Sequence, residues 1–173
     1  MIFLKSNNNM SKSVIVYKYS NLQTFLLVAL RILIGWYFLY EGLVKIANPD
    51  WSSFGYLMDS KGIFSGMFHS MASNAGVLSV VDWLNKWGLT LIGLGLIAGF
   101  LTQIALFAGM LLLIMYYMSH PALASVSYIL PQEGSYLWVN KTLIEAVTLA
   151  LLLVFPTGHI FGLDRFIFKS DKK

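Results

Sequence analysis

Ionisable side chains stand inside the long apolar stretches of this 173-residue sequence, where charges are costly. They are Arg31, Glu41, Lys45 and Glu145, with Lys141 at the edge of the last stretch. A charge in a membrane interior is expensive unless it is paired or hydrated, so each of these residues is a candidate functional residue. Carboxylic acids and amines can also donate, accept or relay protons. The chemistry therefore depends on which elements bring these groups together.

The spacing of the acids and amines favours one polar cluster. Glu41 and Lys45 are four residues apart, as are Lys141 and Glu145, so each pair lies on one helix face. If the two helices cross a membrane in opposite directions, Glu41 and Glu145 both lie about 9 Å from the outer helix ends. We then expect Glu41 to reach Lys141 and Lys45 to reach Glu145. The sequence thus predicts a polar cluster in the outer third of a helical bundle.

Two interpretations of this cluster remain open. In the first it is a substrate-binding site, with Glu41 and Glu145 as the candidate catalytic groups. In the second it is a set of interfacial ion pairs that fix the helix register. Arg31 lies on the inner half, where it extends to the surface, binds a lipid phosphate or contacts helix-end carbonyls. The candidate binding residues are Glu41, Lys45, Asn140, Lys141, Glu145, His120, Trp138 and Arg31.

The composition indicates a membrane protein. Apolar residues make up 57% of the chain and charged residues 12%, which a small soluble domain could not bury. Apolar runs at 22–47, 77–100, 101–118 and 139–156 predict four spans, and 48–76 predicts an outer loop with one or two interfacial helices. The expected fold is all-α, an integral membrane antiparallel four-helix bundle over residues 21–168, with the bilayer as its partner.

The distribution of basic residues predicts the orientation. The tails 1–20 and 169–173, together with Arg165, hold seven of the twelve basic residues. An even number of spans puts both tails on one side, and the positive-inside rule makes that side the cytoplasm. We therefore expect a multi-pass protein of the inner (cytoplasmic) membrane with cytoplasmic N- and C-termini.

Small residues recur at helical spacings in every predicted span. They are Gly35 and Gly42, Gly95 and Gly99, Ala105 and Gly109, and Ala146 and Ala150. Because helices in lipid associate by close packing, these residues predict either a seam within the bundle or a homodimer face. The oligomeric state does not follow from this pattern.

Several kinds of site are excluded or disfavoured. The chain has no cysteine, which excludes thiolate catalysis and iron–sulfur ligation. The histidines His69, His120 and His159 form no i, i+4 pair, so no metal site or intramembrane haem is predicted. No basic patch is interleaved with exposed aromatic residues, so we expect no nucleic-acid partner.

The order of short motifs resembles the DoxX/DoxD-like family of small four-span membrane proteins over about residues 22–168. The first span contains LRILIG (30–35) and EGLVK (41–45), followed by NPDW (48–51). The predicted hairpin contains GLGLIAGFLT (93–102), and the chain closes with GHIFGLDR (158–165). This last segment looks like the family's closing Gly-x-small-Leu-Asp element.

The sequence departs from the family pattern at two places. Gln103 stands where many members have a basic residue after the hairpin threonine. Asn85 and Lys86 stand where relatives often have an acidic residue near the start of the second span, so a catalytic role shared at that position is in doubt.

The resemblance implies a function class. The family takes its name from a subunit of an archaeal thiosulfate:quinone oxidoreductase. We therefore expect a subunit of a membrane redox complex, with a quinone or small-sulfur-compound site in the outer third of the bundle. No cofactor is bound by a clear motif, so electrons would come from a redox partner protein or a bound reductant. The alternatives are a non-enzymatic anchor or assembly subunit and a small-amphiphile binding or transport protein.

Overall fold

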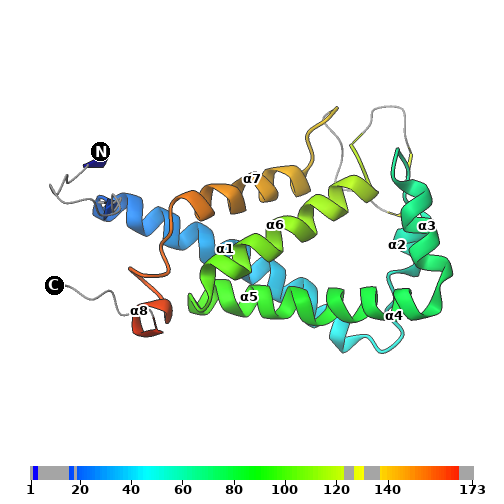
Figure 1. The fold of residues 1–173 in the computed structure, drawn as a ribbon, viewed down its shortest axis with the longest axis horizontal. Coiled ribbons are helices and arrows are strands. Elements are labelled where there is room, and N and C mark those ends of the chain that lie inside the picture. The colour runs from blue at the N-terminus through cyan, green and yellow to red at the C-terminus, as the bar shows by residue number, and fades with distance from the viewer. Residues whose placement is uncertain (1, 4–15, 18, 123–126, 131–136, 168–173) are drawn as a thin grey trace, which may run out of the picture.

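The computed structural model describes residues 2–3, 16–17, 19–122, 127–130 and 137–167 (Figure 1). Most of these residues form helices, as predicted. A two-stranded antiparallel ribbon, β1 (Ile2–Phe3) with β2 (Val16–Tyr17), precedes them and was not predicted. The C-tail 169–173 and most of the N-tail lie outside the described residues.

The first helix, α1 (Asn21–Ala47), starts at a capping box. The Ser20 hydroxyl accepts from the Gln23 amide at 3.2 Å, and the Gln23 side chain accepts from the Ser20 amide at 2.9 Å. The helix ends before Asn48 and Pro49, because a residue before proline is disfavoured in helical conformation. Its bounds agree closely with the predicted first span.

The second long helix contains a π-helical turn that the sequence did not predict. It comprises α4 (Ala75–Trp83), the π-helix η1 (Leu84–Gly88) and α5 (Leu89–Ala98). It begins two residues earlier than predicted because Asn74 caps the amides of Gly76 and Val77. It ends two residues earlier because Gly99 adopts a left-handed φ of +65°.

The remaining long helices are α6 (Thr102–Ser119) and α7 (Lys141–Val154). Asn140 caps α7 by accepting from the Leu143 amide at 2.9 Å, so the helix is shorter than the predicted run 139–156. Short helices α2 (Phe54–Met58) and α3 (Ser65–Ser73) confirm that the loop 48–76 contains helices. A last turn, α8 (Asp164–Ile167), follows α7.

Among the residues that the structure describes, three helices are long and apolar enough to cross a membrane: α1, the continuous helix Ala75–Ala98, and α6. At 14 residues, α7 is about 21 Å long, less than the roughly 30 Å of a hydrocarbon core. Figure 1 shows α1, α5, α6 and α7 along the long axis, with α3 lying across one end. We call the end with α2 and α3 the cap end, and the end with the α5–α6 turn and α8 the tail end.

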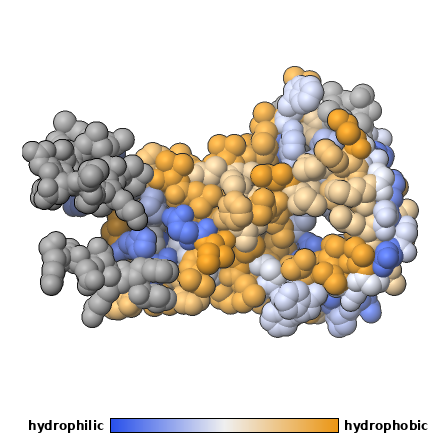
Figure 2. Space-filling model, viewed as in Figure 1, coloured by the Kyte–Doolittle hydropathy of each residue, from blue (hydrophilic) through white to orange (hydrophobic). Residues whose placement is uncertain are grey.

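The helices enclose two separate hydrophobic cores. The main core joins the four long helices and includes Phe38, Leu96, Leu106 and Leu149. A smaller core at the cap end contains Leu57, Phe68 and Ala72, with partly buried residues of α4 and α6 packed on it. Large apolar side chains remain exposed along the outside of the long helices, and Figure 2 shows this apolar surface over the middle of the molecule. Such a surface suits lipid.

The small residues form a seam inside the molecule. Gly35 lies against Leu96, and Gly109 lies against Leu149 and Phe38. At Gly93 an added Cβ would stand 2.6 Å from the Cα of Leu39, so the backbones of α1 and α5 are in direct contact. Of the two interpretations, the intramolecular seam is confirmed for Gly35 and Gly109, and Gly93, which was not predicted, also belongs to it.

A methyl group at this contact should separate the helices. We expect Gly93→Ala to destabilise the protein by about 1–3 kcal/mol, because the methyl group meets backbone atoms that cannot move independently. Gly66→Ala is the matched control, since an added Cβ there has no atom within 4 Å and alanine favours helix. Thermal unfolding in detergent measures both. Equal melting temperatures for the two variants would contradict this account of the seam.

Candidate functional site

The predicted site residues on α1 form an ion pair within one helix. The Lys45 ammonium lies 2.5 Å from a Glu41 carboxylate oxygen and also donates to the Glu41 carbonyl at 3.2 Å. The Glu41 side chain is 41% exposed and that of Lys45 16%. The partner of Lys45 is thus Glu41, four residues earlier on the same helix, whereas the sequence had suggested Glu145.

A tyrosine of α1 contacts a lysine of α7. The Lys141 ammonium lies 4.2 Å from the centre of the Tyr37 ring, a cation–π contact, and also interacts with the hydroxyl group. Glu145 and Glu41 are close enough for their charges to act on Tyr37. Lys141 of α7 thus contacts Tyr37 of α1, and the charges of two acids act on the same phenol.

The π-helical turn adds an amide to the same level. Asn85 donates to the Val81 carbonyl at 2.9 Å, and its side-chain oxygen accepts a hydrogen bond from the hydroxyl of Tyr116 on α6. Thr90 bonds the Lys86 carbonyl at 2.8 Å, which satisfies a backbone acceptor next to the turn. Such turns inside α-helices are frequent at functional sites.

Together these side chains form a layer to which every long helix contributes. Tyr116 donates to Asn85 and lies within electrostatic range of Tyr56, Glu41 and Tyr37. We call the following set the polar layer: Tyr37 and Glu41 of α1, Asn85 of η1, Tyr116 of α6, and Lys141 and Glu145 of α7. Sequence analysis missed the role of Tyr116, which resembled an interfacial aromatic residue. It noticed Asn85 only as a departure from the family pattern.

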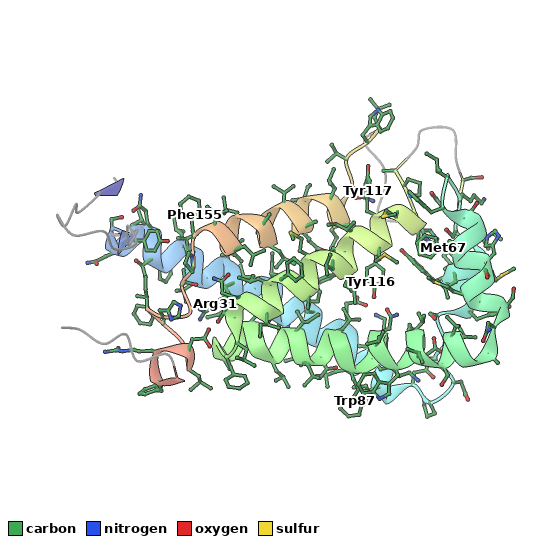
Figure 3. The ribbon with its side chains drawn as sticks, viewed as in Figure 1. Arg31, Met67, Trp87, Tyr116, Tyr117 and Phe155 are labelled. Carbon is green, nitrogen blue, oxygen red and sulfur yellow. The ribbon has the colours of Figure 1, made fainter. Side chains whose placement is uncertain are left out.

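Next to the polar layer the molecule is open. Figure 2 shows an opening through the molecule between the outer part of α6, the helix α4–η1, and the short helices α2 and α3. Figure 3 shows Tyr116 beside it, reaching from α6 toward the α4–α5 helix. The opening thus separates the two hydrophobic cores.

His120 belongs to a separate group at the cap end. Its ring stacks on Tyr56 at 3.9 Å between centroids and lies 4.7 Å from the ring of Tyr128. Its Nε2 is 4.0 Å from a carboxylate oxygen of Asp59. That oxygen accepts from the amides of Ile129 and Leu130, which attaches the second loop to α2. Tyr56 meets Tyr116 edge-to-face at 5.8 Å, so this group borders the polar layer.

Two further predicted residues have structural contacts. Asn140 is the N-cap of α7, as described above. Trp138 has a side chain that is 69% exposed, and its carbonyl accepts from the Tyr117 hydroxyl at 2.8 Å.

Two charged residues of the second long helix contact the loop after α1. Asp82 accepts from the amide and hydroxyl of Ser53, and Lys86 lies 5.6 Å from the Trp51 ring.

Arg31 lies at the tail end, far from Tyr116 in Figure 3. It is 2% exposed and donates to the Thr157 hydroxyl at 3.1 Å and to the Phe161 carbonyl at 2.5 Å. The Phe161 carbonyl lies in the segment between α7 and α8, so this acceptor is not one of the helix-end carbonyls considered for Arg31. A cavity of about 520 Å³ at this end lies between the start of α1 and Phe161.

Asp164 completes the tail-end network. Its carboxylate accepts from the amides of Leu101 and Thr102 at 2.7 and 3.0 Å, which caps α6. Burial alone would raise the pKa of Asp164, but hydrogen bonds from Thr102 and Leu101 outweigh it and lower the pKa below its ordinary value. The closing Leu-Asp element thus ties the C-terminal segment to the α5–α6 turn.

The next question is whether side chains gather to bind a metal ion in the part of the chain that the structure describes. There, no three histidine, aspartate or glutamate side chains are placed to hold a metal ion. His69 bonds the Ser60 carbonyl at 3.1 Å, and His159 lies exposed at the tail end.

The fold and its apolar surface define a helical membrane protein with several candidate spans. The DoxX family model matches residues 26–121, which is more than half of the chain. The chain therefore belongs to the DoxX family, and the resemblance found in the sequence is confirmed. The match runs from α1 to the end of α6, without α7 and the closing element. No curated protein and no solved structure matches the chain.

Acid should weaken the cap end through His120. Burial lowers the pKa of His120 to about 4; the nearby Lys61 acts in the same direction and Asp59 opposes it. The unfolded imidazole has a pKa near 6.5, so the unfolded chain binds the proton more readily. The stabilisation from a neutral His120 is present above about pH 6.5 and is lost as the pH falls toward 4. The loss is at most roughly 3 kcal/mol.

The melting temperature at about pH 7.5 and about pH 4.5 measures this effect. We expect His120→Gln, which cannot take up a proton there, to lose less stability on acidification than the unaltered protein. His159→Gln is the control at the other end of the molecule. If His120→Gln and the unaltered protein respond equally to acid, the assignment to His120 is wrong.

Proposed function

We propose that this DoxX family protein is a quinone-binding subunit of a membrane redox complex, with the quinone headgroup at the polar layer. The observation that carries the proposal is the meeting of Lys141 with Tyr37, with the charges of Glu41 and Glu145 acting on the same phenol. These groups lie on helices with lipid-facing apolar surfaces, where a quinone ring and its isoprenoid tail partition.

The chemistry of quinones fits these groups. Reduction of a quinone to a quinol takes two electrons and two protons. Its carbonyl oxygens accept hydrogen bonds, which an ammonium or a phenol can donate, and a carboxylic acid can deliver protons. The electrons would come from a redox partner protein, since the sequence has no motif for an electron-carrying cofactor. Glu41, whose carboxylate pairs with Lys45, and Glu145 are the proposed proton relays, each taking up a proton from water and passing it to the reduced quinone oxygen; Lys141 is the proposed ligand of the quinone oxygen.

We further propose that α7 is a fourth crossing, which makes the protein an antiparallel four-span bundle in the inner membrane with cytoplasmic termini. The short α7 would need a thinner bilayer or help from its flanking residues. Its support is position: α7 packs along α6, and the segment after it bonds to Arg31 at the tail end. The cap end is then the outer end.

Cysteine labelling tests this topology directly, because the chain has no thiol of its own. Ser52→Cys places a thiol at the cap end and Phe166→Cys places one at the tail end, and both positions are exposed. A membrane-impermeant maleimide should label Ser52→Cys in intact cells and Phe166→Cys only after permeabilisation. Labelling of both in intact cells would mean that α7 does not cross.

A binding titration tests the proposed function. The purified protein in nanodiscs is titrated with menaquinone and followed by tryptophan fluorescence. We expect Lys141→Met to raise the Kd about tenfold or more, because it removes a charge-assisted hydrogen bond. Glu145→Gln should alter binding less and slow reduction when an electron donor is supplied. Asp50→Asn, an exposed carboxylate outside the polar layer, is the matched control.

Each outcome of the titration decides between the functions. Saturable binding that Lys141→Met weakens and Asp50→Asn leaves unchanged supports the quinone site. If menaquinone changes the tryptophan fluorescence of neither the unaltered protein nor any variant, the proposal is wrong and the anchor or assembly function is favoured.

A further inference from the structure

The opening beside the polar layer interrupts the packing of the protein at membrane depth. The main core ends at the level of Leu89 and Leu113, and the smaller core begins with residues such as Leu57 and Phe68. Between them stand polar and aromatic side chains, and Figure 2 shows the surface open at this place. Interiors are normally close-packed, so a break between two cores needs an explanation.

The π-helical turn presents hydrogen-bonding groups at this break. Asn85 uses its oxygen for Tyr116 and one amide proton for the Val81 carbonyl. An asparagine amide carries a second proton, and a tyrosine oxygen can accept as well as donate. The pair thus offers both a donor and an acceptor to a ligand, within a helix long and apolar enough to span a membrane.

The sides of the opening are suited to a flat ring. Tyr116 and Tyr56 meet edge-to-face at 5.8 Å, and His120 continues the aromatic stack on Tyr56. Aromatic faces and edges bind planar π-systems better than they bind flexible chains. A ligand here would have a planar ring with at least one oxygen that accepts or donates a hydrogen bond.

The opening is visible in a view from the side of the bundle, where lipid would be (Figure 2). Leu84, Trp87 and the neighbouring Trp83 are exposed, with fractions of 48%, 45% and 58%, so apolar surface surrounds this part of the helix. Figure 3 shows Trp87 on the side of the helix that faces away from Tyr116. A molecule dissolved in the bilayer could therefore reach Asn85 and Tyr116 without crossing water.

We propose that this opening is the lateral entrance of the quinone site, and that the Asn85–Tyr116 pair recognises the oxygen-bearing ring as it enters. This inference rests on the proposed function and adds to it the route, the selecting residues and the ligand class, a planar quinoid or phenolic ring. Lys141 of α7 and Tyr37 of α1 then contact the ring from the other side of the polar layer.

Two ligands of nearly equal shape distinguish hydrogen-bonded recognition of the ring oxygens from mere occupation of the opening by an apolar ring. Menadione (2-methyl-1,4-naphthoquinone) carries the ring oxygens, and 2-methylnaphthalene lacks them. Binding of both to the full-length protein in nanodiscs is measured by equilibrium dialysis against empty nanodiscs. We expect menadione to bind about tenfold more tightly after correction for lipid partition, as hydrogen bonds to the protein would give. Equal affinities would overturn the inference without the use of any variant.

Neighbouring tyrosines on α6 provide a matched pair of variants. Tyr116→Phe removes the hydroxyl at the opening, whereas Tyr117→Phe removes the one that bonds the Trp138 carbonyl. Tyr116→Phe and Asn85→Leu should each raise the Kd of menadione about three- to tenfold and leave that of 2-methylnaphthalene unchanged. Tyr117→Phe should change neither. Melting curves without ligand identify any variant that fails to fold.

The comparison with Lys141→Met keeps the two proposals separable. If menadione binding depends on Lys141 but not on Tyr116 or Asn85, the quinone site stands and the entrance is wrong. If it depends on Tyr116 and Asn85 but not on Lys141, the entrance stands and the assignment of Lys141 falls. If it depends on none of them, both proposals fail.

Discussion

The hydrocarbon core of a bilayer cannot supply hydrogen bonds, and this constraint governs the polar side chains of the protein. Arg31 shows it most directly, because a guanidinium that is 2% exposed has to find its acceptors in the chain. It finds them at Thr157 and Phe161, in the segment after α7. The same segment places Asp164 on the first amides of α6. One buried cation and one carboxylate thus hold α1, the α5–α6 turn and the C-terminal segment in one arrangement.

The two ends of the molecule meet the constraint in different ways. At the tail end, Arg31 and Asp164 bond mainly to backbone atoms and a short hydroxyl, which have fixed positions. In the polar layer, side chain meets side chain: Tyr116 with Asn85 and Lys141 with Tyr37, while Glu41 pairs with Lys45 next to the layer. Rotatable side chains can exchange such partners for a ligand at small cost, whereas backbone partners cannot move. This difference is why we assign a structural role to Arg31 and a binding role to the polar layer.

Much of the fold could be predicted from apolar runs and capping residues. The bounds of α1 and α6, the helices in the outer loop and the seam of small residues all follow from patterns local in the sequence. The level shared by Glu41 and Glu145 was also accessible, since it needs only helix rise and direction. The partners of the charged side chains could not be predicted from the sequence. A lysine reaches an acid four residues away as easily as one on another helix, so spacing alone could not choose between Glu41 and Glu145 as the partner of Lys45.

The residues at the opening were missed for a geometric reason. A helical wheel assumes 100° per residue, and the π-helical turn at Leu84–Gly88 inserts one extra residue and rotates everything beyond it. Without that turn, Asn85 and the small face of α5 could not both point where they do. Asn85 bonds Tyr116 of α6, while Gly93 packs on α1 at Leu39. The turn therefore permits one helix to pack tightly over one half and to present a polar group at a gap over the other. This division of a single span is what a buried site with an open side requires.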